Sequence, residues 1–183
     1  MRRNTDPGLL STWNTAVKAT IAYSAQTGEY AMIVNKYRQT LSLYRAGYRV
    51  AEYMADLGSN PFSAKRQQGD EATPEGRYHV VKKLGASQSN YHKALVLDYP
   101  NSQDRERYRR LEHYLPYLPW PPGIGGQIQI HGAGGRNQNW TSGCIAVDDR
   151  IMDQLFAVAK VGTPVTIVAN ETVQQLLNSI HRN

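Results

Sequence analysis

Three short strand-like segments follow one another between Tyr30 and Leu57, and only tight turns separate them. The first two cover residues 30–35 and 40–44, with a four-residue loop between them that suits a hairpin, and the third covers 49–57. Parallel neighbours would need a crossover of roughly a dozen residues or more, usually a helix, between each pair. The segments therefore predict antiparallel pairing and exclude a fold built on a purely parallel α/β sheet.

The rest of the chain predicts further strands with helices attached to them. Pro7 after Asp6 is typical of a helix start, and apolar residues at three- and four-residue spacing continue to Ile21, with Gly28 as the expected stop. Ser102 and Asp148 are each expected to cap a helix. The further expected strands are 77–84, 94–99, 128–131 and 165–168, and the expected helices are 7–28, 103–113, 149–159 (with Ile151, Met152, Leu155 and Phe156 buried) and 172–181.

A length of 183 residues suits one domain with a buried core. We expect a mainly β domain over residues 29–170, an N-terminal helical appendage over 1–28, and a C-terminal helix over 171–183 packed on the domain. No apolar run approaches the ~18 residues of a membrane span. The first residues also lack the apolar stretch of a signal peptide, so we expect a cytosolic protein or an export segment outside this chain.

The chain carries 21 Lys and Arg against 15 Asp and Glu, which gives a net charge of +6. Such a surplus can attract nucleic acid, anionic lipid or an acidic envelope polymer, and it equally suits solvated surface arginines. The densest cluster, residues 105–110, is expected on the outer face of a helix without any RNA-binding motif. We therefore predict no nucleic-acid partner.

The segment from His131 to Val147 contains the only cysteine of the chain, Cys144, which excludes an internal disulfide and a cysteine-rich zinc site. An imidazole such as that of His131 can activate a thiol, and Gly143 permits a turn whose amides point to one oxyanion. From spacing alone, a small buried structural cysteine stays the alternative. His131 and Cys144 are too few ligands for a metal ion, so we predict neither metal nor cofactor.

The residues around this pair occur in a specific order, with matching pieces upstream and downstream. The pieces are Asn35-Lys36, Leu41-Ser42-Leu43-Tyr44, Gly69-Asp70-Glu71-Ala72-Thr73-Pro74-Glu75-Gly76-Arg77-Tyr78, Leu97-Asp98-Tyr99-Pro100-Asn101, Ile130-His131-Gly132, Trp140-Thr141-Ser142-Gly143-Cys144-Ile145-Ala146-Val147 and Gly162-Thr163-Pro164-Val165. This order resembles the catalytic domain of the L,D-transpeptidase (YkuD) family, in its Gly-Cys-Ile-Ala branch, over about residues 29–169.

The resemblance implies a YkuD-like β-sandwich that acts on the stem peptides of peptidoglycan. Cys144 would attack the diamino acid carbonyl at the third stem position and expel the terminal D-alanine, with His131 as the base. The N–H groups of Gly143 and Cys144 would hold the oxyanion, and the Gly132 carbonyl is the expected partner of the imidazole. An amine of a second stem would then open the thioester to give a 3→3 cross-link. The expected location is the periplasm or cell envelope.

Two departures from the family pattern concern the substrate contacts. Many members have histidine where Ser142 stands and arginine where Ala146 stands, so another arginine is expected to bind the substrate carboxylate. The residues predicted to contact substrate are Ser142, Trp140, Arg77, His92 and Arg136, with Arg150 as a further candidate and residues 115–126 as a possible lid. Tyr91, next to His92 and just before an expected strand, is a further candidate for the lining of the cleft.

Several alternatives stay open at this point. Water as acceptor would make the protein an L,D-carboxypeptidase, and a protein amine would make it an enzyme that attaches proteins to stems or releases them. A basic, non-catalytic module that binds the envelope or nucleic acid is a different class. A papain-like amidase is disfavoured because those enzymes place cysteine before histidine. The sequence leaves the oligomeric state open.

Overall fold

The computed structural model describes residues 7–114 and 123–169 of the chain. Asp6, the expected C-terminal helix at 172–181 and residues 115–122 of the expected lid lie outside the described residues. Within the described ranges, no helix combines the length and the apolar character that crossing a membrane requires.

Eight strands of the described chain form one sheet in the order β3-β2-β1-β8-β4-β5-β6-β7. The expected antiparallel pairing of the first three strands is confirmed, whereas β8 runs parallel to β1 and β7 runs parallel to β6. The predicted mainly β fold is therefore confirmed, and its sheet contains both antiparallel and parallel pairs of strands. The strands are β1 (Tyr30–Asn35), β2 (Thr40–Arg45), β3 (Tyr48–Met54), β4 (Gly76–Leu84), β5 (Ala94–Leu97), β6 (Gln129–His131), β7 (Ile145–Ala146) and β8 (Pro164–Val168).

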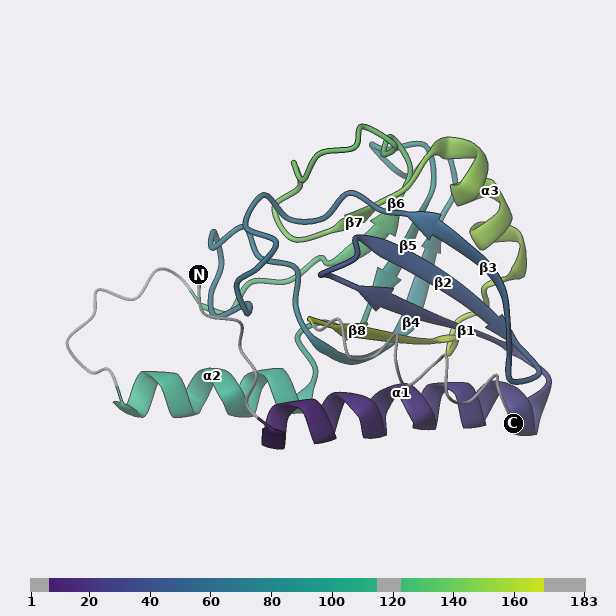
Figure 1. Ribbon diagram of the computed structural model, residues 1–183. Coiled ribbons are helices and arrows are strands. Elements are labelled where there is room, and N and C mark those ends of the chain that lie inside the picture. The colour runs from purple at the N-terminus through teal and green to yellow at the C-terminus, as the bar shows by residue number, and fades with distance from the viewer. Residues whose placement is uncertain (1–6, 115–122, 170–183) are drawn as a thin grey trace.

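The sheet curls until its two end strands come together (Figure 1). Beyond β3 the chain turns away from β2, and Asp56 pairs with Ala146 of β7, each amide donating to the other's carbonyl at 2.8 Å. The third strand, expected over 49–57, therefore ends at Met54. Its last residues link the two ends of the sheet, and this long-range pairing is invisible in the local pattern.

One large apolar core fills the inside of the curl. It draws side chains from seven of the strands and from helix α3 (Asp149–Val158). Met152 and Leu155 of α3 are fully buried, and Ile151 and Phe156 pack on the core from its edge. The Asp148 carboxylate accepts from the Arg150 amide at 2.9 Å, so the expected cap of this helix is confirmed.

Helix α1 (Pro7–Thr27) covers the outer face of the sheet (Figure 1). Trp13, Val17 and Ile21 form a second, smaller core with side chains of β1, β2 and β8. The hydroxyl groups of Thr20 and Thr166 meet at 2.6 Å within this contact. The predicted apolar face of the helix is thus confirmed for the residues whose side chains are described.

Helix α2 (Ser102–Tyr114) begins one residue earlier than expected. Its cap is Asn101, whose side-chain oxygen accepts from the amides of Gln103 and Asp104 at 2.9 and 3.2 Å. The Asp104 carboxylate accepts in return from the Asn101 amide at 3.0 Å. The prediction of Ser102 as cap is wrong, because asparagine and serine are equally good caps and stand side by side here.

Candidate active site

Strands β6 and β7 bring His131 and Cys144 to one face of the sheet. The strands pair in parallel, with Ile130 opposite Ile145 and His131 opposite Ala146. Cys144 directly precedes β7, and side chains alternate between faces along a strand, so Cys144 shares the face of Ala146 and His131. His131 and Cys144, thirteen residues apart in the sequence, therefore lie diagonally opposite each other on adjacent strands.

The His131 ring is oriented by the backbone of the next residue. Its Nδ1 lies 2.7 Å from the Gly132 carbonyl oxygen, and the side chain is buried. Because a carbonyl can only accept, Nδ1 carries the proton of the neutral ring and Nε2 is left as a proton acceptor. The expected role of the Gly132 carbonyl agrees with this contact.

Two aromatic rings enclose the imidazole. The Tyr91 ring stacks on His131 with centroids 4.4 Å apart and planes 24° apart, and the Trp140 ring meets it edge-on at 5.9 Å. The Tyr91 carbonyl also accepts from the Gly132 amide at 3.0 Å. Sequence reasoning named Tyr91 together with His92 as residues that could line the cleft, and of the two it is Tyr91 whose ring lies on the imidazole. An aromatic residue just before a strand that pairs with the histidine strand is the signal that identifies it.

A tight turn presents Cys144, the candidate nucleophile. The Thr141 hydroxyl donates to the Cys144 carbonyl at 2.7 Å and accepts from the Gly143 amide at 3.2 Å. Gly143 has φ +117°, and a Cβ there would lie 2.8 Å from the Ala72 carbonyl oxygen, so only glycine fits. The Gly143 N–H, predicted as an oxyanion donor, is engaged within the turn, and its catalytic role stays a prediction.

Burial shifts both members of the pair toward their neutral forms. It raises the pKa of the Cys144 thiol, against a backbone hydrogen bond at Gln129 and the Lys65 charge, which lower it. Burial also lowers the pKa of His131; the Gly132 carbonyl acts in the opposite sense and the Arg136 charge in the same sense. Both shifts favour a neutral thiol and a neutral imidazole, so a reaction at the sulfur would require the thiol proton to move to an acceptor.

Asp56 organises the rim of the site next to Trp140. Its buried carboxylate accepts from the Arg136 amide at 2.9 Å and from the Trp140 indole N–H at 3.3 Å. The Arg136 guanidinium lies 3.9 Å from the Trp140 ring centroid, and its Nε donates to the Ala133 carbonyl. The Arg136 charge is thus held over Trp140, whose ring contacts His131.

Other predicted contact residues lie elsewhere. The His92 ring is 2.7 Å from the Asp153 carboxylate of α3 at the surface. On β4, the residue in line with His131 is Leu84, because Leu84 lies opposite Ala94 of β5 and Ala94 lies opposite His131. Arg77 is exposed seven positions before Leu84 on the same strand. The structure brings neither side chain to the imidazole.

The remaining two predicted contact residues, Ser142 and Arg150, both have exposed side chains. Ser142 is exposed within the turn that carries Cys144, whereas Arg150 is exposed in the first turn of α3. Among the described residues, no group of three or more His, Cys, Asp or Glu side chains is arranged to hold a metal ion.

Comparisons with known proteins agree on one family. The model of the L,D-transpeptidase catalytic domain (YkuD) matches residues 29–167. YafK of Escherichia coli (strain K12), whose name assigns it to the L,D-transpeptidases, is 28% identical over 109 residues, 60% of this chain and 35% of that protein.

Solved structures share the fold. The helical cell shape determining protein Pgp2 from Campylobacter jejuni matches with a TM-score of 0.59 and 22% identity, over 78% of this chain and 48% of that one. Bd1075 from Bdellovibrio bacteriovorus matches with a TM-score of 0.57 and 21% identity, over 85% and 55%. The chain thus spans about a third of the curated relative and about half of these two structures.

Proposed function

This chain belongs to the L,D-transpeptidase catalytic domain (YkuD) family, and on that premise we propose that it is a cysteine-dependent L,D-transpeptidase of peptidoglycan stem peptides. The observation that carries the proposal is the placement of Cys144 and His131 on one face of β6 and β7, with Nδ1 of the imidazole committed to the Gly132 carbonyl. Nε2 is then the atom available to take the thiol proton.

Acylation begins with a neutral thiol. Nε2 of His131 takes the proton as the Cys144 sulfur attacks the carbonyl carbon of the diamino acid at the third stem position. The resulting oxyanion needs backbone donors, for which we propose the Cys144 amide and, once released from Thr141, the Gly143 amide. The imidazolium then gives its proton to the departing nitrogen, the C–N bond breaks, and D-alanine leaves behind a thioester.

Transfer of the acyl group to the acceptor reverses the acylation steps. A side-chain amine of a second stem attacks the thioester while Nε2 takes its proton, and the C–S bond breaks with the proton returning to the sulfur. The product is a 3→3 cross-link, and Cys144 is a thiol again. Water in place of the amine gives a tripeptide stem, which is the L,D-carboxypeptidase reaction.

Arg136 is the best-placed candidate for the substrate carboxylate. Its guanidinium is exposed, lies on Trp140 and has the neighbouring backbone of Ala133 as a partner, so little side-chain freedom is lost when an anion binds. We propose Arg136 as the substitute for the arginine of other family branches, in whose place Ala146 stands here. Because the substrate is an envelope polymer, we propose that the protein acts in the periplasm or cell envelope.

The test is mass spectrometry of tetrapeptide muropeptides incubated with the protein, with Cys144→Ala as the control. A dimer lighter by one D-alanine, absent with Cys144→Ala, supports the transpeptidase. Tripeptide monomer alone would assign the carboxypeptidase instead. Equal turnover by Cys144→Ala, or no change with the wild-type protein and any amine acceptor, would refute the proposed chemistry.

A further inference from the structure

The loop of residues 136–146, which carries the candidate nucleophile, is held at both ends by Asp56. At one end, the Asp56 backbone pairs with that of Ala146, and each amide donates to the other's carbonyl at 2.8 Å. At the other end, Oδ2 of Asp56 accepts from the Arg136 amide at 2.9 Å. The Asp56 side chain is buried. One residue outside the loop thus contacts both of its ends.

The residues that follow Asp56 hold the middle of the same loop. The Leu57 carbonyl accepts from the amides of Trp140 and Thr141, both at 3.1 Å, and the Ser59 amide donates to the Thr141 carbonyl at 2.9 Å. Backbone groups that lack a regular strand ladder must find partners elsewhere. The shape of the loop therefore depends on the short segment that contains Asp56.

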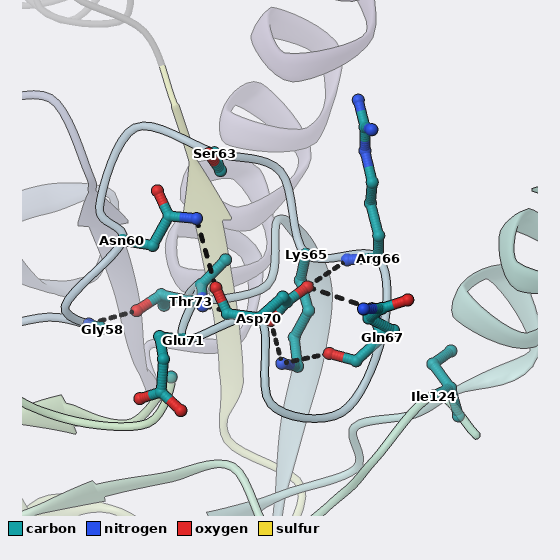
Figure 2. A network of polar contacts seen from close by, with 12 residues as sticks. Gly58, Asn60, Ser63, Lys65, Arg66, Gln67, Asp70, Glu71, Thr73 and Ile124 are labelled. Atoms are coloured by element: carbon teal, nitrogen blue, oxygen red, sulfur yellow. Dashed lines mark hydrogen bonds and ion pairs between the residues drawn. The ribbon is translucent and has the colours of Figure 1, made fainter. Parts of the chain in front are cut away.

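A network centred on Asp70 fixes this segment, residues 56–60, in its turn (Figure 2). The Gly58 amide donates to the Thr73 hydroxyl at 2.9 Å, and the Asn60 side chain donates to the Asp70 carbonyl at 3.2 Å. The Asp70 carboxylate accepts from one buried ammonium and three backbone amides. Asp56 therefore belongs to a segment with a fixed backbone, as a residue that positions others requires.

The Asp56 carboxylate also orients the Trp140 ring. Oδ2 accepts from the indole N–H at 3.3 Å, which leaves the faces of the ring available for other contacts. The ring meets His131 edge-on at 5.9 Å, and the Arg136 guanidinium lies 3.9 Å from its centroid. A cation over an indole follows the face of that ring. A hydrogen bond that fixes the ring thus also fixes the place of the guanidinium.

We propose that Asp56 is a positioning residue for substrate binding. It orients Trp140 and, through that ring, holds the Arg136 guanidinium where the carboxylate of the stem peptide binds. The inference rests on the proposed function, because it takes Arg136 as the group that binds this carboxylate. The role of Asp56 is geometric, and it acts through its two neighbours.

The negative charge of Asp56 acts in the opposite direction. A carboxylate near the site repels the carboxylate of a stem peptide. Its hydrogen bond with Arg136 is to the backbone amide, whereas the guanidinium donates to the Ala133 carbonyl. Removal of Asp56 would therefore strengthen substrate binding if only its charge mattered, and it weakens binding if Asp56 positions the ring and the guanidinium. The two effects have opposite signs.

The experiment measures kcat and KM of Asp56 variants on tetrapeptide muropeptides. In Asp56→Ala we expect KM to rise about five- to twentyfold and kcat to stay within about threefold, because hydrogen bonds that shape the binding site are lost. His131 keeps its contact with the Gly132 carbonyl. Asp56→Asn keeps an acceptor oxygen and should recover most of the wild-type KM. An unchanged or lower KM in Asp56→Ala would overturn the proposal.

Trp140→Phe tests the same contact from the other side, because it removes the indole N–H and keeps an aromatic ring. KM should rise, and the double variant with Asp56→Ala should be little worse than Asp56→Ala alone, since both changes break one contact. Fully additive effects would overturn the proposal. If Asp56→Ala does not fold, Trp140→Phe decides the matter, and a wild-type KM would then overturn the proposal.

Asp104→Ala is the matched control, because it removes another buried carboxylate, on α2, that accepts from the Tyr78 hydroxyl at 3.0 Å. Its KM should equal that of the wild-type protein. An equal rise of KM in Asp104→Ala and Asp56→Ala would overturn the proposal in favour of a general effect of losing a buried charge.

The contact can also be observed without substrate. Trp140 supplies one of the three indole N–H signals in a nuclear magnetic resonance spectrum, the one that Trp140→Phe lacks. Its exchange with solvent should be about tenfold faster in Asp56→Ala. A wild-type protein inactive on muropeptides would refute the transpeptidase, while faster exchange would still support the hold of Asp56 on Trp140. Unchanged exchange and KM in an active enzyme would refute only the role of Asp56.

Discussion

Strands β1, β2 and β3 are six, six and seven residues long, whereas β5, β6 and β7 around the candidate site are four, three and two. The long strands are held by extended antiparallel ladders, with one shift of the β2–β3 register between Leu43 and Tyr44, and β1 and β2 carry side chains buried on both faces. The short strands lie among residues with positive φ, including His92, Gln127 and Ala133. The first group is a periodic scaffold, and the second is an irregular support for the two candidate catalytic side chains, His131 and Cys144.

Different contacts stabilise the two groups. Around the site, carboxylates and amides hold the backbone directly: Asp149 accepts from the Ala133 amide at 2.7 Å, and Asn139 accepts from the Leu57 amide at 2.9 Å. Such contacts fix position without burying much apolar area. Changes in the scaffold should therefore cost stability, and changes at the site should cost activity while the fold persists.

The largest expected effect is the loss of the base. His131→Ala should lower kcat about 10²- to 10⁴-fold, because general-base catalysis typically contributes that much. Its thermal midpoint should stay near that of the wild-type protein, since the neighbouring strands keep their ladders. Steady-state turnover of tetrapeptide stems and a melting curve measure both quantities. A kcat within threefold of wild type would remove His131 from the mechanism.

A substitution in the scaffold should lower the stability of the fold and leave the activity unchanged. Leu41 of β2 is fully buried in the large core, so Leu41→Ala should lower the free energy of unfolding by about 2–5 kcal/mol. Turnover per folded molecule should be unchanged. Denaturant unfolding and active-site titration give the two values, and Val50→Ala, at an exposed position of β3, is the control with little expected effect. An equal loss in both variants would contradict the comparison.

The pH dependence follows from the lowered pKa of His131. The imidazole must be neutral to accept a proton, so kcat/KM should fall about tenfold per pH unit on the acid side. Because burial lowers the pKa of His131 from its ordinary value of 6.5, this fall should begin below pH 6.5. A pH profile of kcat/KM measures it, and an acid limb at or above 6.5 would show that burial does not control the base.

A smaller effect is expected for the ring that stacks on the imidazole. Tyr91→Ala removes the stacking contact and should lower kcat about three- to tenfold, consistent with the roughly 0.5–1.5 kcal/mol of an aromatic pair. Tyr91→Phe keeps the ring and serves as the conservative control. Loss of kcat with unchanged KM in Tyr91→Ala, and near wild-type rates in Tyr91→Phe, would support ring orientation as its role.

The smallest effect concerns the surface pair of Lys160 and Glu29, which are both largely exposed. Lys160→Ala should change the free energy of unfolding by less than about 1 kcal/mol, because water and salt screen exposed ion pairs. Denaturant unfolding at low and high salt measures the change. A larger loss would mean that this contact between the start of β1 and the end of α3 belongs to the scaffold.

The same comparison explains what sequence reasoning predicted. The strands of the scaffold and the apolar faces of α1 and α3 were predicted because periodicity is a local property of the chain. Strand β7 was missed because two residues carry no period. The Gly-Cys-Ile-Ala resemblance named Cys144 and His131, but no local pattern distinguishes Arg136, which lies at the site, from Arg77, which does not. Asp56 was missed, and Tyr91 was not distinguished from His92, because only the pairing of distant strands brings Asp56 and Tyr91 there.

Burial of the Cys144 thiol has a consequence for oxidation. Peroxides react with thiolates far faster than with thiols, and the product sulfenic acid can be lost to irreversible higher oxides. With no second cysteine in the chain, a disulfide cannot form within it to protect or rescue this sulfur. Burial, by raising the pKa of the thiol, favours the protonated sulfur, which oxidants attack slowly.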